Sequence, residues 1–347
     1  MARVCVTGGS GFVGSQVVRD LLEAGHEVRT TVRDPSRAPE GLVDLGPEIV
    51  TADLGDPESF RSAFSGSEYV IHTASPYVLQ VGDPQRDLID PAVNGTLSVL
   101  NAATANPSVK RVVLTSSFAA ITDQPDGTFD EGMWNDHSSV DRNPYYFSKV
   151  AAERAAWGFA RGQTQFDLVV INPSVVLGPS LVPSLNTSAS VLVGLLRAQY
   201  PGILDLDYAI VDVRDVAKAH RLAMETPTAS GRYLCSAEVW TQRRLADWIR
   251  GANLGLGKPP RIGLDNPLGR FVTRLAARFQ PPGNRDYVLT HLGRHPRLNT
   301  EKIRTELGMT FRPSGETLID TVLDLQRWGH LSANPGFAAA LDADNGP

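Results

Sequence analysis

Short, almost wholly apolar runs recur along the first half of the chain at the spacing of strand-helix-strand units. Runs with so little polar alternation predict strands that are covered on both faces, as in a parallel sheet. Helical stretches separate most of these runs. The sequence therefore predicts an α/β fold with a Rossmann-type, doubly wound parallel sheet over residues 1–175. The apolar runs occupy residues 4–6, 28–32, 49–51, 69–72, 112–115 and 168–171.

Beyond Pro173 the regular alternation weakens, and a polar segment rich in Ser, Pro and Asn follows at residues 178–190. We expect residues 208–236 to return to the large sheet. Residues 176–207 and 237–340 are expected to form a smaller, mostly C-terminal region that binds the substrate.

Composition and charge exclude several classes of partner. The chain of 347 residues carries 33 basic and 38 acidic residues, which gives a formal net charge of -5. It lacks the positive excess with which proteins bind a phosphate backbone, so we expect no nucleic-acid partner. No run of about 20 apolar residues is present, so no membrane span is expected. The expected partner is a small molecule.

Cysteine and histidine usage indicates a cytoplasmic protein without a metal. Cys5 and Cys235 show neither a CxxC motif nor a zinc-ligand spacing, which argues against a disulfide framework and a structural metal. The first residues lack the basic and apolar segments of a secretion signal. His291 and His295 have a metal-ligand spacing, but no glutamate completes an HExxH motif and Pro296 follows at once.

A glycine-rich turn, TGGSGFVG at residues 7–14, follows the first predicted strand and opens a helix. This context favours a dinucleotide-binding turn over a glycine-rich hairpin. Gly8 permits the tight turn, Gly11 lets the backbone approach a pyrophosphate, and Gly14 lets the helix pack on the strand. The helix N-terminus supplies N–H donors and a positive dipole end. We expect the cofactor to contact Thr7, Gly8, Gly11, Phe12, Val13 and Gly14.

The end of the second strand predicts which dinucleotide binds. An acidic residue at this point favours NAD, whereas Arg33 offers a guanidinium to the 2′-phosphate of NADPH. Asp34 follows directly, but it is also typical of a turn. We favour NADPH, with Arg37 as a second phosphate ligand. Asp53, after the third strand, is expected either to accept from the adenine amino group or to cap a turn.

Tyr145 and Lys149 are four residues apart on a predicted helix, so their side chains share one face. A nearby ammonium lowers the pKa of a phenol, which makes Tyr145 a proton donor usable near neutral pH. Tyr146 is a weaker rival. A second donor for the developing oxyanion is expected at the end of the strand before it. Spacing alone does not choose between Ser116 and Ser117.

Other polar and aromatic residues near these positions are expected to be structural. His72 ends a strand and His220 lies on a predicted helix, and both are typical of hydrogen-bonded core residues. Residues 129–134 lie between Ser117 and Tyr145 in the sequence. They are expected to fill core volume or to wall a substrate pocket.

Taken together, these residues resemble the extended short-chain dehydrogenase/reductase family, in particular its dihydroflavonol reductase-like branch. The resemblance implies a catalytic triad of Ser117, Tyr145 and Lys149, with Lys149 also bonding the nicotinamide ribose. It also implies that Arg33 contacts the 2′-phosphate, with Asp53 and Leu54 by the adenine, Ala74 and Ser75 along the ribose, and Pro173 on the nicotinamide. The motifs that carry it are TGGSGFVG (7–14), TVRDP (31–35), HTASP (72–76), VNGT (93–96), LTSS (114–117), YYFSK (145–149), NP (172–173), GP (178–179) and DVRDVA (212–217).

The function implied by the resemblance is reversible, NADPH-dependent reduction of a hydrophobic or aromatic aldehyde or ketone, by a monomer or homodimer. Cinnamoyl-CoA reductases, a nearby branch, usually carry a Trp-Tyr pair and a glycine before the lysine. This chain has NPYYFSK at residues 143–149, so an acyl-CoA substrate is disfavoured. Two alternatives stay open: a nucleotide-sugar epimerase or dehydratase that retains NAD, which Arg33 argues against, and a non-catalytic dinucleotide sensor.

Overall fold

The structure is a computed structural model, and it describes residues 1–75, 82–124, 126–197, 201–252, 259–280 and 282–332. A large sheet of parallel strands runs in the order β11-β7-β5-β4-β1-β2-β3, which confirms the predicted doubly wound sheet. The strand order reverses beside β1, and such folds bind ligands at the carboxyl edge there. The strands are β1 (Arg3–Thr7), β2 (Glu27–Val32), β3 (Glu48–Thr51), β4 (Tyr69–His72), β5 (Arg111–Thr115), β7 (Asp167–Pro173) and β11 (Gly231–Cys235).

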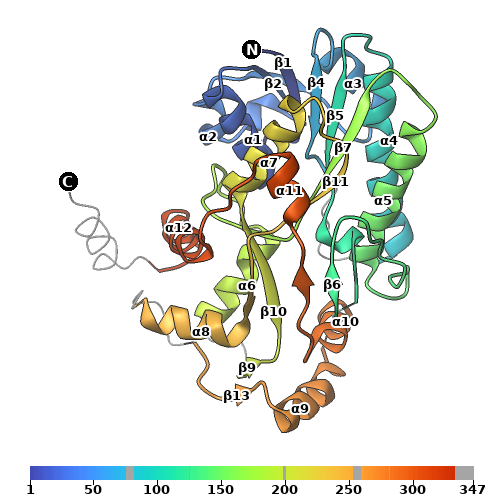
Figure 1. Cartoon of the computed structure of the whole chain (residues 1–347). Helices are drawn as coiled ribbons and strands as arrows, with labels where there is room; N and C mark the ends of the chain where they lie inside the picture. The colour runs from blue at the N-terminus through green and yellow to red at the C-terminus, as the bar shows by residue number, and fades with distance from the viewer. Residues whose placement is uncertain (76–81, 125, 198–200, 253–258, 281, 333–347) are drawn as a thin grey trace.

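Helices cover both faces of this sheet (Figure 1). Val4 and Val6 of β1 are buried in one core cluster with α1 and α7, whereas Cys5 between them is buried in another with α3, α4 and α5. Since successive strand residues face opposite layers, strands covered on both sides need nearly continuous apolar runs. The helices of the two layers are α1 (Phe12–Glu23) and α7 (Val213–Glu225), then α3 (Pro57–Ala63), α4 (Asp90–Thr104) and α5 (Pro144–Ala160).

Smaller sheets and further helices build the rest of the molecule around a separate buried cluster. β10 (Asp207–Asp212) lies between β8 (Val175–Leu177) and β12 (Glu238–Thr241). The remaining short strand pairs are β9 (Ile203–Leu204) with β13 (Gly263–Leu264) and β6 (Thr128–Phe129) with β14 (Arg297–Leu298). The helices of this region are α6 (Thr187–Leu196), α8 (Gln242–Gly251), α9 (Pro267–Ala277), α10 (Pro282–His291) and α12 (Ser314–Arg327), whereas α11 (Glu301–Glu306) packs on β11 of the large sheet.

The segment 208–236 divides between these two regions. α7 and β11 pack in the large-sheet region, whereas β10 pairs within the small sheet. The boundaries of a separate substrate-binding region remain a prediction. Residues 333–340 of that predicted region lie outside the described residues.

Both cysteines lie in strands of the large sheet and are fully buried as free thiols. Burial raises the pKa of the Cys5 thiol to about 12, and it also raises the pKa of Cys235. Among the described helices, none combines the length and the apolar character that crossing a membrane requires.

Candidate active site

The glycine turn joins β1 to α1 at the carboxyl edge of the large sheet. Gly8 has a φ of 77°, and its carbonyl oxygen accepts a hydrogen bond of 2.9 Å from the Gly11 amide. A Cβ at Gly14 would lie 2.2 Å from that same oxygen, so glycine is required for α1 to pack so closely. No side chain caps the start of α1 at Phe12, which leaves first-turn N–H groups for an anion. Thr7 and Val13 belong to the same strand-turn-helix unit.

The segment after β4 crosses directly over this turn. A Cβ at Gly8 would lie 2.8 Å from the Cα of Ala74. Thr73 Oγ1 donates to the Thr7 carbonyl at 2.7 Å, and Thr7 Oγ1 and His72 Nδ1 share a hydrogen bond of 2.7 Å. Burial lowers the pKa of His72 to about 3, so its ring stays neutral. His72 is therefore the hydrogen-bonded core residue that the sequence predicts.

At the end of β2 the two predicted phosphate ligands, Arg33 and Arg37, are exposed. Asp34 Oδ1 accepts hydrogen bonds from the Ser36 amide at 3.0 Å and the Ser36 hydroxyl at 2.7 Å. These bonds lower the pKa of Asp34 and engage its carboxylate in the turn. Neither arginine forms a salt bridge with a described residue. Their contact with a 2′-phosphate stays a prediction.

Asp53 forms a turn after β3. Its Oδ1 accepts a 2.7 Å hydrogen bond from the Gly55 amide. Asp53 was expected either to cap a turn or to accept from the adenine amino group. The structure shows the turn, and the contact with adenine stays a prediction. Leu54 lies in the wall of the pocket at the sheet edge.

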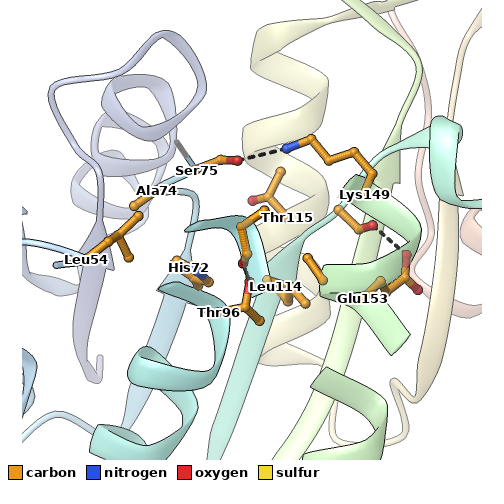
Figure 2. Close-up of a pocket in the computed structure, with 12 residues that line it drawn as sticks. Leu54, His72, Ala74, Ser75, Thr96, Leu114, Thr115, Lys149 and Glu153 are labelled. Atoms are coloured by element: carbon orange, nitrogen blue, oxygen red, sulfur yellow. Dashed lines mark hydrogen bonds between the residues drawn. The ribbon is translucent and has the colours of Figure 1, made fainter. Parts of the chain in front are cut away.

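Figure 2 shows that pocket, which the ends of β4 and β5 form with α4 and α5. Lys149 Nζ donates a 2.8 Å hydrogen bond to Ser75 Oγ, so α5 is joined to the segment after β4. Burial lowers the pKa of Lys149 to about 8. The pocket is lined by Leu54, His72, Ala74, Ser75, Ala92, Thr96, Leu114, Thr115, Ser116, Lys149, Ala152 and Glu153.

The two adjacent tyrosines at the start of α5 have different surroundings. Tyr145 is 40% exposed, and Lys149 Nζ lies 5.6 Å from its ring centre. Tyr146 packs against His291 of α10 at 5.8 Å between ring centres. Burial raises the pKa of Tyr146 well above its usual value, which makes it a poor proton donor and acceptor at neutral pH. The surroundings favour Tyr145 as the group that exchanges a proton with a substrate.

The adjacent serines after β5 also differ. Ser116 Oγ donates to the buried carboxylate of Glu153 at 2.5 Å. Ser117 Oγ accepts from the Ala119 amide at 3.1 Å and caps the short helix η3 (Phe118–Ala120). This leaves the Ser117 O–H to donate to another group. The structure therefore favours Ser117 as the oxyanion donor, as the family resemblance implies.

Asn143 fixes the start of α5. It is the only non-glycine residue with a positive φ, 50°, in the described part of the chain. Its Nδ2 donates to both carboxylate oxygens of the buried Asp123, at 2.9 and 3.0 Å, and Ser138 Oγ donates to the same group at 2.8 Å. A left-handed asparagine costs about 1 kcal/mol or more unless its surroundings enforce it. The Asp123 contacts thus hold the backbone just before Tyr145.

A buried carboxylate that sequence reasoning missed lies beneath Lys149. Glu153 is 1% exposed and accepts hydrogen bonds from Arg232 Nε at 2.6 Å, Ser116 Oγ at 2.5 Å and Asn172 Nδ2 at 2.8 Å. The Asn172 amide also donates to the Ser117 carbonyl at 3.1 Å. We call these four side chains, of Glu153, Arg232, Ser116 and Asn172, the Glu153 network. The sequence signal for Glu153 was only its position four residues after Lys149 on one helix face, which reveals neither its burial nor its partners.

The Glu153 network reaches the loop that was considered as a pocket wall. Arg232 donates to the carbonyls of Glu131, at 3.0 Å, and Met133. Its guanidinium lies 4.0 Å from the ring centre of Trp134. One buried ion pair therefore joins α5, β11 and the loop between Ser117 and Tyr145.

The remaining predicted residues lie at the edges of the site. Pro173 ends β7 in a buried position, paired with Cys235 of β11. His220 Nε2 and Thr115 Oγ1 share a 2.7 Å hydrogen bond, and burial lowers the pKa of His220 to about 4. His291 Nδ1 bonds the Tyr287 carbonyl at 2.9 Å. Within the described ranges, no three His, Cys, Asp or Glu side chains are grouped to hold a metal ion.

Comparison with known proteins identifies a family and several similar reductases. The family model described as "NAD dependent epimerase/dehydratase family" matches residues 4–235. Cinnamoyl-CoA reductase CAD2 of Medicago truncatula is 40% identical over 280 residues, which cover 76% of this chain and 85% of that protein. Anthocyanidin reductase of Arabidopsis thaliana is 36% identical over 270 residues, which cover 71% of this chain and 79% of that protein.

A solved structure agrees in fold. Yeast methylglyoxal/isovaleraldehyde reductase Gre2 complexed with NADPH superimposes with a TM-score of 0.78 at 29% identity, covering 94% of this chain and 99% of that chain. Over most of its length, the chain is similar to proteins that are named as reductases.

Proposed function

Since the chain belongs to the NAD dependent epimerase/dehydratase family, in its dihydroflavonol reductase-like branch, we propose that it reversibly reduces the carbonyl group of a small molecule to an alcohol. NADPH, when bound, supplies the hydride. The observation that carries the proposal is the position of Lys149, whose ammonium lies 5.6 Å from the ring centre of the exposed Tyr145. The same ammonium bonds Ser75, and both residues line the pocket.

The glycine turn fits a dinucleotide. Side chains at Gly8 or Gly14 would collide with backbone atoms, so the turn keeps its N–H groups accessible. The exposed Arg33 and Arg37 at the end of β2 supply positive charge for a 2′-phosphate, while Asp34 is engaged in its own turn. Gre2, which shares the fold, was crystallised with NADPH. These features support NADPH over NADH.

The catalytic residues act on the carbonyl oxygen. Tyr145 donates a proton to this oxygen as the carbon is reduced, and the Lys149 ammonium stabilises the phenolate that remains. Ser117 donates a hydrogen bond to the same oxygen as negative charge develops on it. In the reverse direction the Tyr145 phenolate takes the proton back from the alcohol. Mutual approach of these three side chains around a substrate is part of the proposal.

A hydrophobic or aromatic aldehyde or ketone is the proposed substrate. Tyr146 packs edge-on beside Tyr145, and Tyr287 stacks on the His291 ring that Tyr146 contacts, and such aromatic surfaces suit an apolar substrate. A second candidate is an acyl-CoA thioester, which the likeness to cinnamoyl-CoA reductase CAD2 favours. The NPYYFSK sequence at residues 143–149 argues against it.

NADPH consumption by the purified protein tests these candidates. The panel comprises aromatic and aliphatic aldehydes, diketones, ketoesters and one matched pair, cinnamaldehyde and cinnamoyl-CoA. We expect the aldehyde to be reduced and the thioester to be inert. Turnover of the thioester alone would establish the second candidate. No turnover on any compound would contradict the proposed function and favour a dinucleotide sensor. Stoichiometric NAD released by denaturing the purified protein would instead favour an epimerase or dehydratase.

The choice of cofactor has its own test. Arg33→Ala should raise the KM for NADPH about tenfold or more and leave that for NADH nearly unchanged, because a charge-assisted bond to phosphate is lost. Arg61→Ala is the matched control, since Arg61 is an exposed arginine on α3, paired with Glu58 at 3.5 Å. An unchanged preference in Arg33→Ala would show that this arginine does not read the 2′-phosphate.

A further inference from the structure

Helix α9 exposes its large apolar side chains and buries its small ones. Gly269, Thr273 and Ala277, spaced four residues apart, face the protein. Phe271 is 65% exposed and Phe279, just beyond the helix, is 85% exposed. An ordinary surface helix has the opposite arrangement, with its large apolar residues facing the core. The exposed side chains are Ile262, Leu268, Phe271, Val272, Leu275 and Phe279, which we call the α9 stripe.

The α9 stripe has a polar rim. Arg274 and Arg278 lie exposed beside it. Arg270 pairs with Asp205 at 3.1 Å on the inner side of the helix, and Arg243 pairs with Asp265. An apolar centre with an arginine-containing rim is typical of protein interfaces. Figure 1 places α9 at the end of the molecule away from the large sheet, clear of the pocket in Figure 2.

The area of the stripe matches the apolar part of a standard-size protein interface. An aromatic side chain covers ~200 Å² and an aliphatic one on the order of 100 Å², so the stripe leaves roughly 500 Å² of apolar surface in water. A standard interface buries about 800 Å² per partner, of which about 65% is apolar in homodimers. Patches at the upper end of what monomers expose, about 300–600 Å², commonly mark a functional surface.

We propose that the α9 stripe is the interface of a homodimer, in which a second copy packs its own stripe against the first. Two-fold symmetry needs one self-complementary patch, and a purely apolar stripe is complementary to itself. Arg274 and Arg278 remain in water at the rim in this arrangement. An anionic membrane fits less well, because the chain carries a net charge of -5 and the two arginines lie on one side of the stripe.

The interface has a consequence for the site. α9 packs on α10, and in α10 the rings of Tyr287 and His291 stack at 4.4 Å between centres. His291 in turn contacts Tyr146, the neighbour of Tyr145. A second copy held on α9 would therefore brace the helix beside the catalytic tyrosine. The proposal itself does not depend on the reaction that the site catalyses.

Light scattering during size-exclusion chromatography tests the proposal with the full-length protein. We expect the wild type at micromolar concentration to have twice the 37.5 kDa mass of one chain. The double variant Phe271→Ser/Phe279→Ser should have the mass of one chain, with an unchanged circular dichroism spectrum because both side chains lie in water. Val43→Ser is the matched control, since Val43 is 50% exposed on α2 (Glu40–Val43), and it should stay dimeric.

A cysteine cross-link locates the interface. Leu275 lies within the stripe, so the variant Leu275→Cys places a thiol there. Mild oxidation should link two copies through this residue alone, because both native thiols are buried. Val43→Cys should not cross-link. A monomeric wild type, or a double variant that stays dimeric, would overturn the proposal. Monomeric protein that sediments with vesicles of anionic phospholipid would overturn it in favour of a lipid surface.

Discussion

Two sets of polar side chains at the site are in opposite circumstances: Tyr145, Lys149, Ser75 and Ser117, which we call the mouth, and the Glu153 network, which we call the floor. At the mouth, Tyr145 is 40% exposed and Lys149 makes its hydrogen bond to Ser75. At the floor, Glu153 is 1% exposed and is surrounded by donors from Arg232, Ser116 and Asn172. A group that exchanges protons with a substrate must stay accessible, whereas a buried charge must have its partners supplied. We therefore expect changes at the mouth to affect the rate and changes at the floor to affect stability first.

The largest expected effect is on the rate, at the mouth. Tyr145→Phe should lower kcat by about 10²- to 10⁴-fold, because general acid catalysis is lost. NADPH binding, measured by fluorescence titration, and the melting temperature should be nearly unchanged. Tyr146→Phe serves as control and should keep most of the activity. If Tyr146→Phe were the inactive variant, the assignment of the two tyrosines would be reversed.

The next effect is on stability, at the floor. Glu153→Gln leaves the Arg232 guanidinium buried without a counter-charge, which should cost about 3–5 kcal/mol of unfolding free energy. Urea denaturation measures this loss. Glu58→Gln, which alters an exposed ion pair with Arg61, should change stability by less than about 1 kcal/mol. A small loss in Glu153→Gln would mean that the network contributes little to the fold.

The neighbouring serines provide a direct comparison of mouth and floor. Ser117→Ala should reduce kcat by roughly 10²-fold through loss of an oxyanion donor, with little change in stability. Ser116→Ala should leave kcat within a few-fold and cost about 1–2 kcal/mol, because Glu153 loses one of its donors. Equal effects of the two substitutions on both measurements would contradict the distinction.

The smallest effect is on pH dependence. The pKa of Lys149 is lowered to about 8, so its ammonium is present below that pH and is lost above it. The value of kcat/KM for NADPH, which reports the free enzyme, should therefore fall roughly fivefold between pH 8 and pH 9, because the protonated fraction drops from about one half to about one tenth. Lys149→Arg should move this decline to higher pH, since a guanidinium stays charged. An unshifted decline in that variant would assign it to another group.

The large sheet could be predicted from the sequence because its strands are covered by helices on both faces. Such strands consist of nearly continuous apolar runs, which are not typical of loops. The family resemblance is confirmed by the family model and by the similar reductases. It could be predicted because the glycine turn requires backbone conformations that few other residues adopt. The roles of Ser117, Tyr145 and Lys149 remain predictions. The structure adds reasons for them, because Ser116 bonds Glu153, and Tyr146 packs against His291 and has a raised pKa.

Other features depend on contacts between residues far apart in the chain, which spacing does not show. Glu153 and Arg232 meet although 79 positions separate them, and an isolated glutamate on a helix is usually solvated. β10 pairs with β8 and β12 instead of joining the large sheet. Which strands pair depends on tertiary packing, which the local sequence of β10 does not show. The α9 stripe looks like an ordinary buried helix face until its surroundings are known.

The burial of both thiols has a consequence for the proposed chemistry. Accessible thiolates add reversibly to aldehydes and are alkylated by α,β-unsaturated ketones. Cys5 and Cys235 have no exposed surface, and burial keeps them protonated at physiological pH. A reductase of this design handles reactive carbonyl compounds without offering them a nucleophilic sulfur. Covalent modification at sulfur then requires unfolding, since the folded state presents neither thiol.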